Sequence, residues 1–421
     1  MTRKQNAPEI RFEGFADPWE QRKLGDVATI VGGGTPSTNN DAYWDGDIDW
    51  YSPAELGEQV YADRSVRRIT QAGYDSCSAT LLPAGKTILF TSRAGIGNTA
   101  ILRRSACTNQ GFQSLVVNDD TDVYFVYSMT ARIKKFAEQK ASGSTFLEIS
   151  GKGLAAGEFA FPSKDEQTAM GSMFKQLDHL ITLHQRKYDK LCTVKKSMLD
   201  KMFPKPGETE PEIRFEGFTD PWEQRKLGDC FEFLKNNTLS RADLNGENGT
   251  ARNVHYGDIL IKFGDCLDGE RSDLPFITDD TVLPKFAGSI LREGDVVFAD
   301  TAEDEAAGKC VELRKLPKEP TISGLHTIPA RPRFPFGADY LGHYFNSDAY
   351  HRQLLPLMQG IKVISVSKAA LQDTQVRFPS LSEQAAIGAA LSEIDNLITL
   401  HQRKLELLRN IKKSLLNRMF V

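Results

Sequence analysis

The 421-residue chain lacks the patterns that would place it in several large classes of protein. Its six cysteines form no C-x-x-C pair, so we predict neither a zinc site nor a redox motif, and we expect reduced thiols. The first residues, MTRKQNAPEI, have no apolar run behind the basic ones, and no later window is long and apolar enough for a membrane span. We therefore expect a cytoplasmic protein without a membrane partner.

Excess positive charge and catalytic motifs are also missing. The formal net charge of -4 argues against a nucleic-acid binder that is basic on all sides, but it allows a local basic face. The sequence contains no H-E-x-x-H, no G-x-S-x-G, no complete phosphate loop and no zinc-deaminase pattern. The acidic residues at 300–305 are more typical of a solvated loop than of a nuclease metal site. We expect no catalysis, no cofactor and no bound metal, and a role in recognition or scaffolding.

What the sequence does contain is an internal repeat. PEIRFEGFADPWEQRKLGD begins at Pro8 and returns at Pro211 with a single change. A second block, FPSKDEQTAMGSMFKQLDHLITLHQRK from Phe161, returns in altered form from Phe378 and keeps LITLHQRK unchanged. The residues between the blocks show no obvious repeat. The chain therefore alternates constant and variable parts.

This alternation predicts the domain boundaries. We expect a first domain with its constant segment at 1–160, a long helix at 161–203, a linker with the second constant segment at 204–224, a second domain at 225–377 and a second long helix at 378–421.

Each copy of the second block predicts one long helix. Ser163 with Glu166, and Ser380 with Glu383, fit a capping box at the helix start. Residues suited to a coiled-coil seam then recur at alternating steps of four and three. They are Leu177, Ile181, His184, Tyr188, Leu191, Met198 and Met202 in the first copy, and Ile394, Ile398, His401, Leu405, Leu408, Leu415 and Met419 in the second.

Lys195 and Lys412 interrupt the two seams at equivalent points. With a full domain between the helices, the simplest arrangement is an antiparallel pair in which each helix covers the other's apolar stripe. A helix of about 30 residues is about 45 Å long.

The first block, in contrast, is short. Residues 17–20 predict one helical turn with Asp17 as its cap. Its aromatic residues cannot be buried by such a short segment, so they either anchor it to its own domain or dock a partner protein. The candidates for partner binding are Phe12, Phe15, Trp19, Phe215, Phe218 and Trp222.

The variable parts predict mixed, mostly β domains. Residues 81–102 and 290–313 both indicate a strand, a turn and a second strand. Gly85, Lys86 and Thr87 lack the upstream glycine of a phosphate loop, so a hairpin turn is the better interpretation.

Taken together, these blocks resemble the specificity subunit of type I restriction-modification systems. The resemblance rests on two copies of WEQRKLGD, two of F-P-S-x-x-E-Q leading into LITLHQRK, GGGTPSTNNDAYWDGDIDWYSPAEL in the first variable part, and SGLHTI with QGIKVISVSKAAL in the second. It covers nearly the whole chain, and the order of the blocks is more diagnostic than any one of them.

The resemblance implies a DNA-sequence reader without catalysis of its own. The expected fold is α+β, with two β-rich target recognition domains separated by two long antiparallel coiled-coil helices and related by a pseudo-twofold repeat. Each domain would read one half of a bipartite, asymmetric site in double-stranded DNA, with half-sites roughly 34 Å apart. The implied partners are two methyltransferase subunits and ATP-driven motor-nuclease subunits.

Polar side chains beside glycines or aromatic residues can approach groove edges and phosphates. The candidates for DNA contact in the first domain are Thr35, Ser37, Asn39, Arg93, Asn98, Asn109, Gln110, Ser144 and Lys152. Those in the second are Asn236, Asn237, Lys309, His326, Lys362, Ser365 and Lys368.

Two other interpretations are weaker. A fused or stand-alone methyltransferase or nuclease would need an N/D-P-P-Y/F motif or a metal site, and the sequence has neither in convincing form. A coiled-coil adaptor unrelated to DNA would explain the helices, but it gives no reason for two elaborate and unlike domains.

Overall fold

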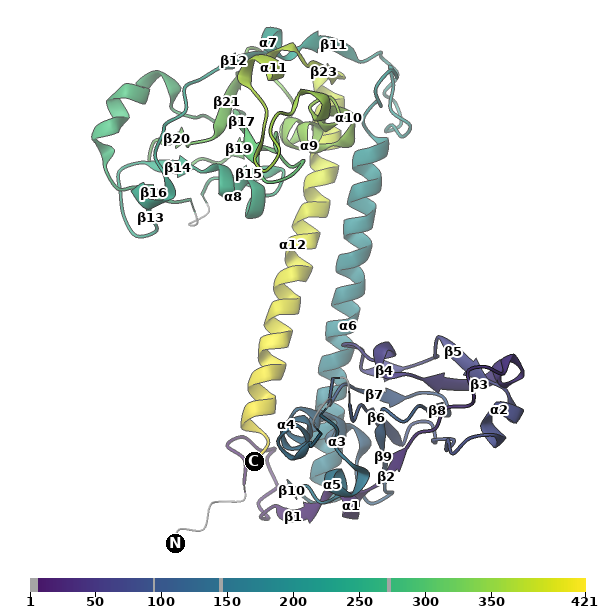
Figure 1. The fold of residues 1–421 in the computed structure, drawn as a ribbon. Helices are drawn as coiled ribbons and strands as arrows, with labels where there is room; N and C mark the ends of the chain where they lie inside the picture. Colours follow the sequence, from purple (N-terminus) through teal and green to yellow (C-terminus); the bar gives the residue numbers. More distant parts are fainter. Residues whose placement is uncertain (1–6, 94, 144–146, 271–273) are drawn as a thin grey trace. The chain divides into compact units, whose positions relative to one another are not determined.

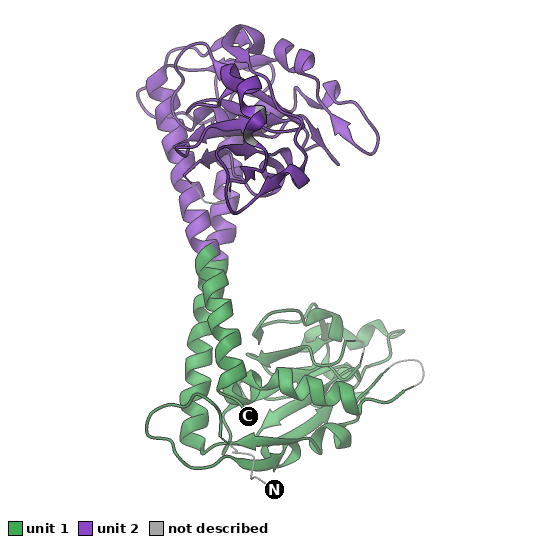
Figure 2. Cartoon of the chain, turned by 90° about the vertical axis from the view of Figure 1, so that its left-hand side faces the viewer, with its two compact units in different colours: residues 1–185, 403–421 green, residues 186–402 purple. Residues whose placement is uncertain are grey.

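The computed structural model describes residues 7–93, 95–143, 147–270 and 274–421 (Figure 1). The chain forms two compact units, of which unit 1 comprises residues 1–185 and 403–421 and unit 2 comprises residues 186–402 (Figure 2). Each unit therefore holds one variable domain, the start of one long helix and the end of the other.

The variable domain of unit 1 is built on two sheets. The larger has the order β2 (Ala28–Gly32), β9 (Gln113–Val117), β6 (Thr87–Phe90), β7 (Thr99–Leu102), β4 (Tyr61–Ala62). Its neighbours are antiparallel except β4 and β7, which are parallel. The smaller sheet has the order β5 (Arg67–Ile69), β3 (Trp44–Tyr51), β8 (Ala106–Thr108), with β3 and β8 parallel.

Unit 2 repeats this topology. Its five-stranded sheet has the order β12 (Phe231–Phe233), β21 (Thr327–Pro332), β17 (Val296–Ala299), β19 (Cys310–Arg314), β15 (Cys266–Asp268), and only β15 and β19 are parallel. The second sheet has the order β13 (Leu244–Asn245), β16 (Phe276–Ile277), β14 (Arg252–Val254), β20 (Thr321–Ser323), with β14 and β20 parallel. Two variable segments without an obvious sequence repeat thus share one fold.

The central strands β6 and β17 are buried on both faces. Ile88 and Phe90 point into a core shared with helices, while Leu89 points into a second core shared with the smaller sheet. Val296 and Phe298 alternate with Val297 in the same way in unit 2. A strand between two layers carries apolar side chains on both faces, which explains VVFA and the last three residues of TILF. The predicted hairpins β6–β7 and β17–β19 are both confirmed.

Short helices surround the sheets. In unit 1 they are α1 (Leu24–Val27), α2 (Gln71–Asp75), α3 (Val123–Ser128), α4 (Thr130–Lys140) and α5 (Gly151–Ala155). In unit 2 they are α7 (Leu227–Cys230), α8 (Tyr256–Ile261), α9 (Tyr340–Asn346), α10 (Asp348–His351) and α11 (Lys368–Asp373). Turns of 3-10 helix occur at Asp41–Tyr43, Pro53–Glu55, Arg241–Asp243, Asp280–Ser289 and Leu355–Leu357.

The repeated letters EQRK form a strand in both copies. β1 (Glu20–Lys23) pairs antiparallel with β10 (Glu158–Phe161), and β11 (Glu223–Lys226) pairs in the same register with β23 (Gln375–Phe378). Each ribbon joins the point where the chain enters a variable domain to the point where it leaves. The predicted helical turn at residues 17–20 is wrong. The Trp19 ring is buried in the core against Phe125, and β1 begins at the next residue.

The long helices are α6 (Lys164–Lys201) and α12 (Leu381–Arg418). The predicted coiled-coil seam is confirmed, because every residue predicted to lie in it is buried or half-buried. In unit 1, Asp178 contacts Lys412 and Gln185 contacts Arg409, so residue numbers rise along one helix as they fall along the other. The pair is therefore antiparallel. No helix among the described residues has the length and apolar character to cross a membrane.

The two lysines that interrupt the seam are paired across it. Lys412 Nζ lies 2.5 Å from Asp178 Oδ1 in unit 1, and Lys195 Nζ lies 2.6 Å from Asp395 Oδ1 in unit 2. These lysines are equivalent in the repeat, as are the two aspartates, so the same ion pair is made twice with the helices exchanged. A lysine in a seam is costly to bury unless it is paired in this way.

The helix starts differ in part from the predicted capping box. Ser163 and Ser380 accept hydrogen bonds from the N–H groups of Glu166 and Glu383, each at 3.4 Å, as expected. The glutamate side chains, however, bind arginines of the constant segments. Arg11 donates two hydrogen bonds to Glu166 at 2.8 and 2.6 Å, and Arg214 donates two to Glu383 at 2.8 Å. A bidentate arginine is a stronger partner for a carboxylate than one backbone N–H.

The glutamine that follows each glutamate in both copies of the repeat joins the helix to its variable domain. Gln167 donates to Pro162 O at 3.0 Å and accepts from Asp122 N at 3.1 Å. Gln384 donates to Pro379 O and accepts from Gly337 N, both at 2.8 Å. The motif F-P-S-x-x-E-Q is therefore a joint between a helix, a constant segment and a domain.

The end of each long helix lies in the unit that the other helix begins. Ile10 N donates to Arg418 O at 3.0 Å in unit 1, and Ile213 N donates to Lys201 O at 2.9 Å in unit 2. Phe420 packs on Trp19 with ring centroids 6.2 Å apart, and Phe203 packs on Trp222 at 6.4 Å. Both units therefore close their cores with residues from the opposite copy of the repeat.

We predict that Phe203→Ala destabilises unit 2 by about 3–5 kcal/mol, because the ring is fully buried and its removal leaves a cavity. Urea unfolding with hydrogen exchange on peptides of unit 2 measures the loss. Leu400→Ala, an exposed α12 position of the same unit, is the control and should change the free energy of unfolding by less than about 1 kcal/mol. Equal losses for both variants would contradict the role of the helix end.

Candidate nucleic-acid interface

Loops from distant parts of the chain meet at one end of the five-stranded sheet in unit 1. Gly34 N donates to Thr108 O at 2.8 Å, Ser92 N donates to Gly111 O at 2.7 Å, and Ile149 N donates to Ser92 O at 3.1 Å. These bonds join the loop after β2, the loop between β6 and β7, the loop after β8 and the segment before α5. We call residues 33–39, 91–93, 95–98, 109–112 and 147–152 loop cluster 1.

Unit 2 joins its loops by the matching bonds. Asn237 N donates to Ser323 O at 2.8 Å, Asp300 N donates to His326 O at 3.1 Å, and Val366 N donates to Asp300 O at 2.8 Å. We call residues 235–237, 300–309, 324–326 and 359–368 loop cluster 2. Because the joining bonds run between backbone groups, the side chains of the two clusters are free to differ.

Most predicted DNA contacts of the first domain fall in loop cluster 1. Thr35 Oγ1 donates to Gln110 Oε1 at 2.6 Å, which brings together two candidates far apart in sequence. Asn109 Oδ1 accepts from Gly111 N at 2.8 Å, and Asn98 Nδ2 lies 3.5 Å from Leu56 O. The amide of Asn109 therefore shapes its own loop.

The other candidates of this domain are placed as follows. Arg93 follows Ser92 in the β6–β7 loop, and Lys152 lies in the first turn of α5. Ser37 and Asn39 are exposed farther along the glycine-rich loop. Ser144 lies outside the described residues.

In loop cluster 2, the exposed candidate His326 contacts side chains from two other segments. Its Nδ1 lies 3.4 Å from Thr301 Oγ1 and 3.4 Å from Asp300 Oδ1, and its ring meets Tyr256 edge-on. Asn236 Nδ2 donates to Gly324 O at 3.3 Å. The partners Thr301 and Tyr256 carry no motif, so sequence reasoning missed them.

Three further candidates lie on the segment 359–368. Ser365 belongs to β22 (Ile364–Ser365), which pairs with β18 (Thr301–Ala302). Lys368 Nζ sits 5.3 Å above the ring of Phe233, and Lys362 is exposed.

Two candidates instead face the interior of their domain. Asn237 is 1% exposed, and its amide donates to Ser323 O and accepts from Leu239 N. Lys309 Nζ donates to Leu260 O at 3.1 Å and Phe263 O at 3.3 Å, and burial lowers the pKa of its ammonium group. Both side chains hold loops in place, and neither presents its polar head at the surface of loop cluster 2.

The aromatic candidates for partner binding also divide. Trp19 and Trp222 are buried in the cores of their units, which favours the anchoring alternative for these two. Phe12, Phe15 and Phe218 are half-buried, while Phe215 is exposed.

A buried charge network in unit 2 joins α6 to the second variable domain. Lys195 Nζ lies 2.6 Å from Asp265 Oδ2 as well as from Asp395. His343 Nδ1 lies 3.0 Å from the same Asp265 oxygen, and Asn346 donates to the other oxygen at 2.8 Å. In unit 1, Asp178 is the counterpart of Asp395. Its second oxygen accepts a hydrogen bond from Tyr124 OH at 2.7 Å, so the two copies of the repeat differ in this contact.

Burial and pairing act in opposite directions on these pKa values. Burial disfavours the Asp265 carboxylate, but the His343 hydrogen bond and the Lys195 charge outweigh it and hold the pKa of Asp265 well below its usual range. Burial also opposes the Lys195 charge, but the two aspartates outweigh it and raise the pKa of Lys195.

Within the part of the chain that the structure describes, Asp265, His343 and Asp395 form the one group of side chains close enough together to hold a metal ion. The Lys195 ammonium group already bonds both carboxylates, so the cation that this cluster favours is supplied by α6.

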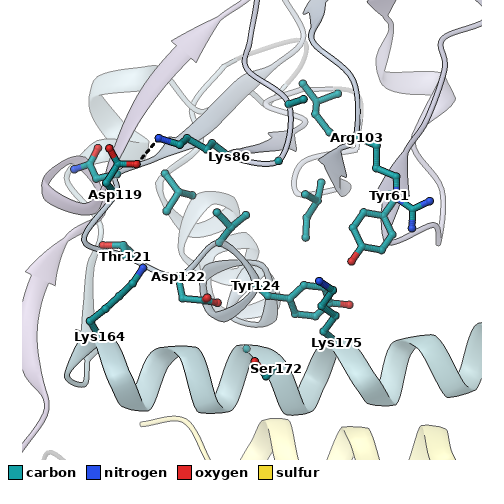
Figure 3. A pocket seen from close by; sticks show the side chains of 18 residues that line it. Tyr61, Lys86, Arg103, Asp119, Thr121, Asp122, Tyr124, Lys164, Ser172 and Lys175 are labelled. Atoms are coloured by element: carbon teal, nitrogen blue, oxygen red, sulfur yellow. Dashed lines mark hydrogen bonds and ion pairs between the residues drawn. The ribbon is translucent and has the colours of Figure 1, made fainter.

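A cavity of about 660 Å³ lies in unit 1 between α6 and the ends of β6, β7 and β9 that are opposite to loop cluster 1 (Figure 3). Lys164 and Lys175 of α6 line it, and Lys86 pairs with Asp119 at its edge. The second copy of the helix has Leu381 and Ser392 at the positions of these two α6 lysines, so their charge belongs to the first copy alone.

Two domains share one topology, and each presents joined loops with different side chains, an arrangement typical of a recognition protein. Comparisons with known proteins identify the family. A family model described as type I restriction modification DNA specificity domain matches residues 16–192. The MjaIX specificity subunit of Methanocaldococcus jannaschii is 30% identical over 296 residues, which cover 68% of this chain and 66% of that protein.

Other relatives extend the match along the chain. The MjaVIII specificity subunit of the same organism is 21% identical over 432 residues, covering 99% of this chain and 95% of that one. The crystal structure of the type I S subunit from M. genitalium has the same fold, with a TM-score of 0.58 at 14% identity over 99% of both chains. The chain belongs to the family of type I restriction-modification specificity subunits, as its repeats suggested.

We predict that Lys195→Met destabilises unit 2 by about 3–5 kcal/mol at pH 7, because it leaves the buried Asp265 and the half-buried Asp395 carboxylates without their cation. The folded-state pKa of Asp265 lies below the unfolded value of about 3.9. The stabilisation by this carboxylate is therefore complete at neutral pH and is lost as the pH falls below about 4.

Hydrogen exchange in α9 and urea unfolding at pH 7 and pH 3.5 measure both effects. Lys196→Met replaces the exposed neighbouring lysine and is the control, with a change below about 0.5 kcal/mol. A Lys195→Met deficit that stays the same at both pH values would contradict the assignment to an ionised network.

Proposed function

We propose that this chain is the DNA sequence-recognition subunit of a type I restriction-modification complex and reads one half of a bipartite site with each loop cluster. The main support is that loop clusters 1 and 2 have matching backbone hydrogen bonds but carry different side chains. Loop cluster 1 offers amide and hydroxyl groups from Thr35 and Gln110, while loop cluster 2 offers His326. Amide side chains pair with adenine, and hydroxyl groups serve either base, so unlike clusters should read unlike half-sites.

Phosphate contacts would position the domains. Arg93 and Lys152 belong to loop cluster 1, and Lys362 and Lys368 belong to loop cluster 2, so each cluster has cations available for the backbone. The net charge of the chain is negative, so we expect tight binding to require partner subunits that share the DNA.

The constant parts would receive the partners. Each unit contains the same constant segment, the same β-ribbon and the same helix joint, which supports one methyltransferase subunit on each unit. Motor-nuclease subunits would join for cleavage. The chain itself would position these enzymes and carry out no chemistry.

Two interpretations compete with this proposal. A fused catalyst would need a methyltransferase or nuclease motif that the sequence lacks. An adaptor unrelated to DNA leaves the two unlike loop clusters without a purpose.

We predict that the complex with its methyltransferase modifies adenines in an asymmetric bipartite site, and that Gln110→Ala and His326→Ala relax different halves of it. Loss of one good base contact should lower discrimination at one base pair about fivefold to a hundredfold. Mapping methylated adenines in cells that express each variant measures this.

Lys190→Ala on the exposed side of α6 is the control and should leave the recognised sequence unchanged. Methylation by the chain without its partner, or relaxation of the same half-site by both loop variants, would overturn the proposal.

A further inference from the structure

A short hairpin in loop cluster 2 exposes apolar side chains at its tip. Gln359 and Ser365 exchange two backbone hydrogen bonds, of 3.0 and 2.8 Å, and close the turn. Ile361 at the tip is 99% exposed and Val363 is 56% exposed, with the exposed Lys362 between them.

The hairpin has a defined conformation. Gly360 has φ 119, and a Cβ atom there would lie 1.8 Å from Val363 O, so the turn requires glycine at this position. Beyond the turn, β22 pairs with β18, and Val366 N donates to Asp300 O. The apolar tip is thus held against the loop that also carries Thr301 and contacts His326.

Exposing these side chains has a cost. Burying an isoleucine or valine side chain stabilises a folded protein, and this turn leaves two such side chains largely exposed in the free protein. Lys362 lies within the apolar tip and Lys368 follows the hairpin in sequence, and a surface that combines apolar and cationic side chains matches a DNA major groove, where thymine methyl groups lie between rows of phosphates.

The residues of the hairpin argue against a protein partner that docks in the same way on both units. Unit 1 has a bridge of the same span between Ser142 and Glu148, but the residues enclosed are GSTFL where unit 2 has GIKVI. A subunit that docks on both units in the same way would need similar residues in both enclosed segments. Unlike residues in equivalent bridged segments are what sequence-reading elements require.

We propose that Ile361 and Val363 read thymine by contact with its C5-methyl group in the major groove of the half-site bound by unit 2. The inference rests on the proposed function and adds an apolar element to a site otherwise built from polar groups. The major groove admits a two-stranded β-ribbon, and the thymine methyl is its one apolar marker.

The test uses the full chain in complex with its methyltransferase subunits and a duplex that carries the mapped target. Fluorescence anisotropy gives the affinity for this duplex and for duplexes in which deoxyuridine replaces single thymines of the unit 2 half-site. Loss of one contacted methyl group should weaken binding by the wild-type complex about fourfold.

Ile361→Ala and Val363→Ala should weaken binding to the thymine duplex by a similar factor and should be insensitive to deoxyuridine at the contacted position. Such non-additivity between the side-chain truncation and the loss of the thymine methyl group identifies a direct contact. Ile261→Ala, which truncates another highly exposed isoleucine of unit 2 outside the hairpin, is the matched control and should retain the full deoxyuridine effect.

Three results would overturn the inference. The unit 2 half-site could contain no thymine, or the variants could lose the same DNA affinity on thymine and deoxyuridine duplexes, as expected for a wedge between bases. The variants could also assemble less well with the methyltransferase while their DNA affinity is unchanged. Failure of the wild-type complex to discriminate its target from other DNA would instead overturn the proposed function together with this inference.

Discussion

Phe420 and Phe203 close the cores of units that begin in the opposite half of the sequence. Each ring packs on the tryptophan of a constant segment, and each helix end accepts a hydrogen bond from that segment. Neither unit can complete its core from its own half of the chain. A constant segment must therefore fit a helix end that belongs to the other copy, and this mutual constraint accounts for two copies that are almost the same where they meet.

The two variable domains can differ in sequence because their common framework is held by backbone hydrogen bonds. Matching N–H to carbonyl bonds join the loops in both units, and both central strands are apolar on both faces. Such a framework accepts many side chains at the loops without loss of fold. The same physical arrangement explains a shared topology without a sequence repeat and gives two surfaces of different chemistry, as the proposed recognition of an asymmetric site requires.

Charge joins the constant and the variable parts. Arg11 and Arg214 hold the starts of the long helices through bidentate contacts, and Lys412 and Lys195 pair with aspartates across the seam. In unit 2 the seam lysine also binds Asp265 of the variable domain, so the helix and that domain share one charge network. Buried pairs of this kind add little net stability but penalise any other register, which suits helices that must meet in one way.

The sequence by itself determined the repeat, the two long helices with their seam and the alternation of constant and variable parts, because helical periodicity and near-identical blocks are local signals. It also placed most candidate residues in loops. Only the tertiary structure decided that Thr35 meets Gln110, that Asn237 and Lys309 face inward, and that residues 17–20 lead into a strand. Those outcomes depend on strands far apart in the chain and on which side chains the core can bury, and no local pattern records either.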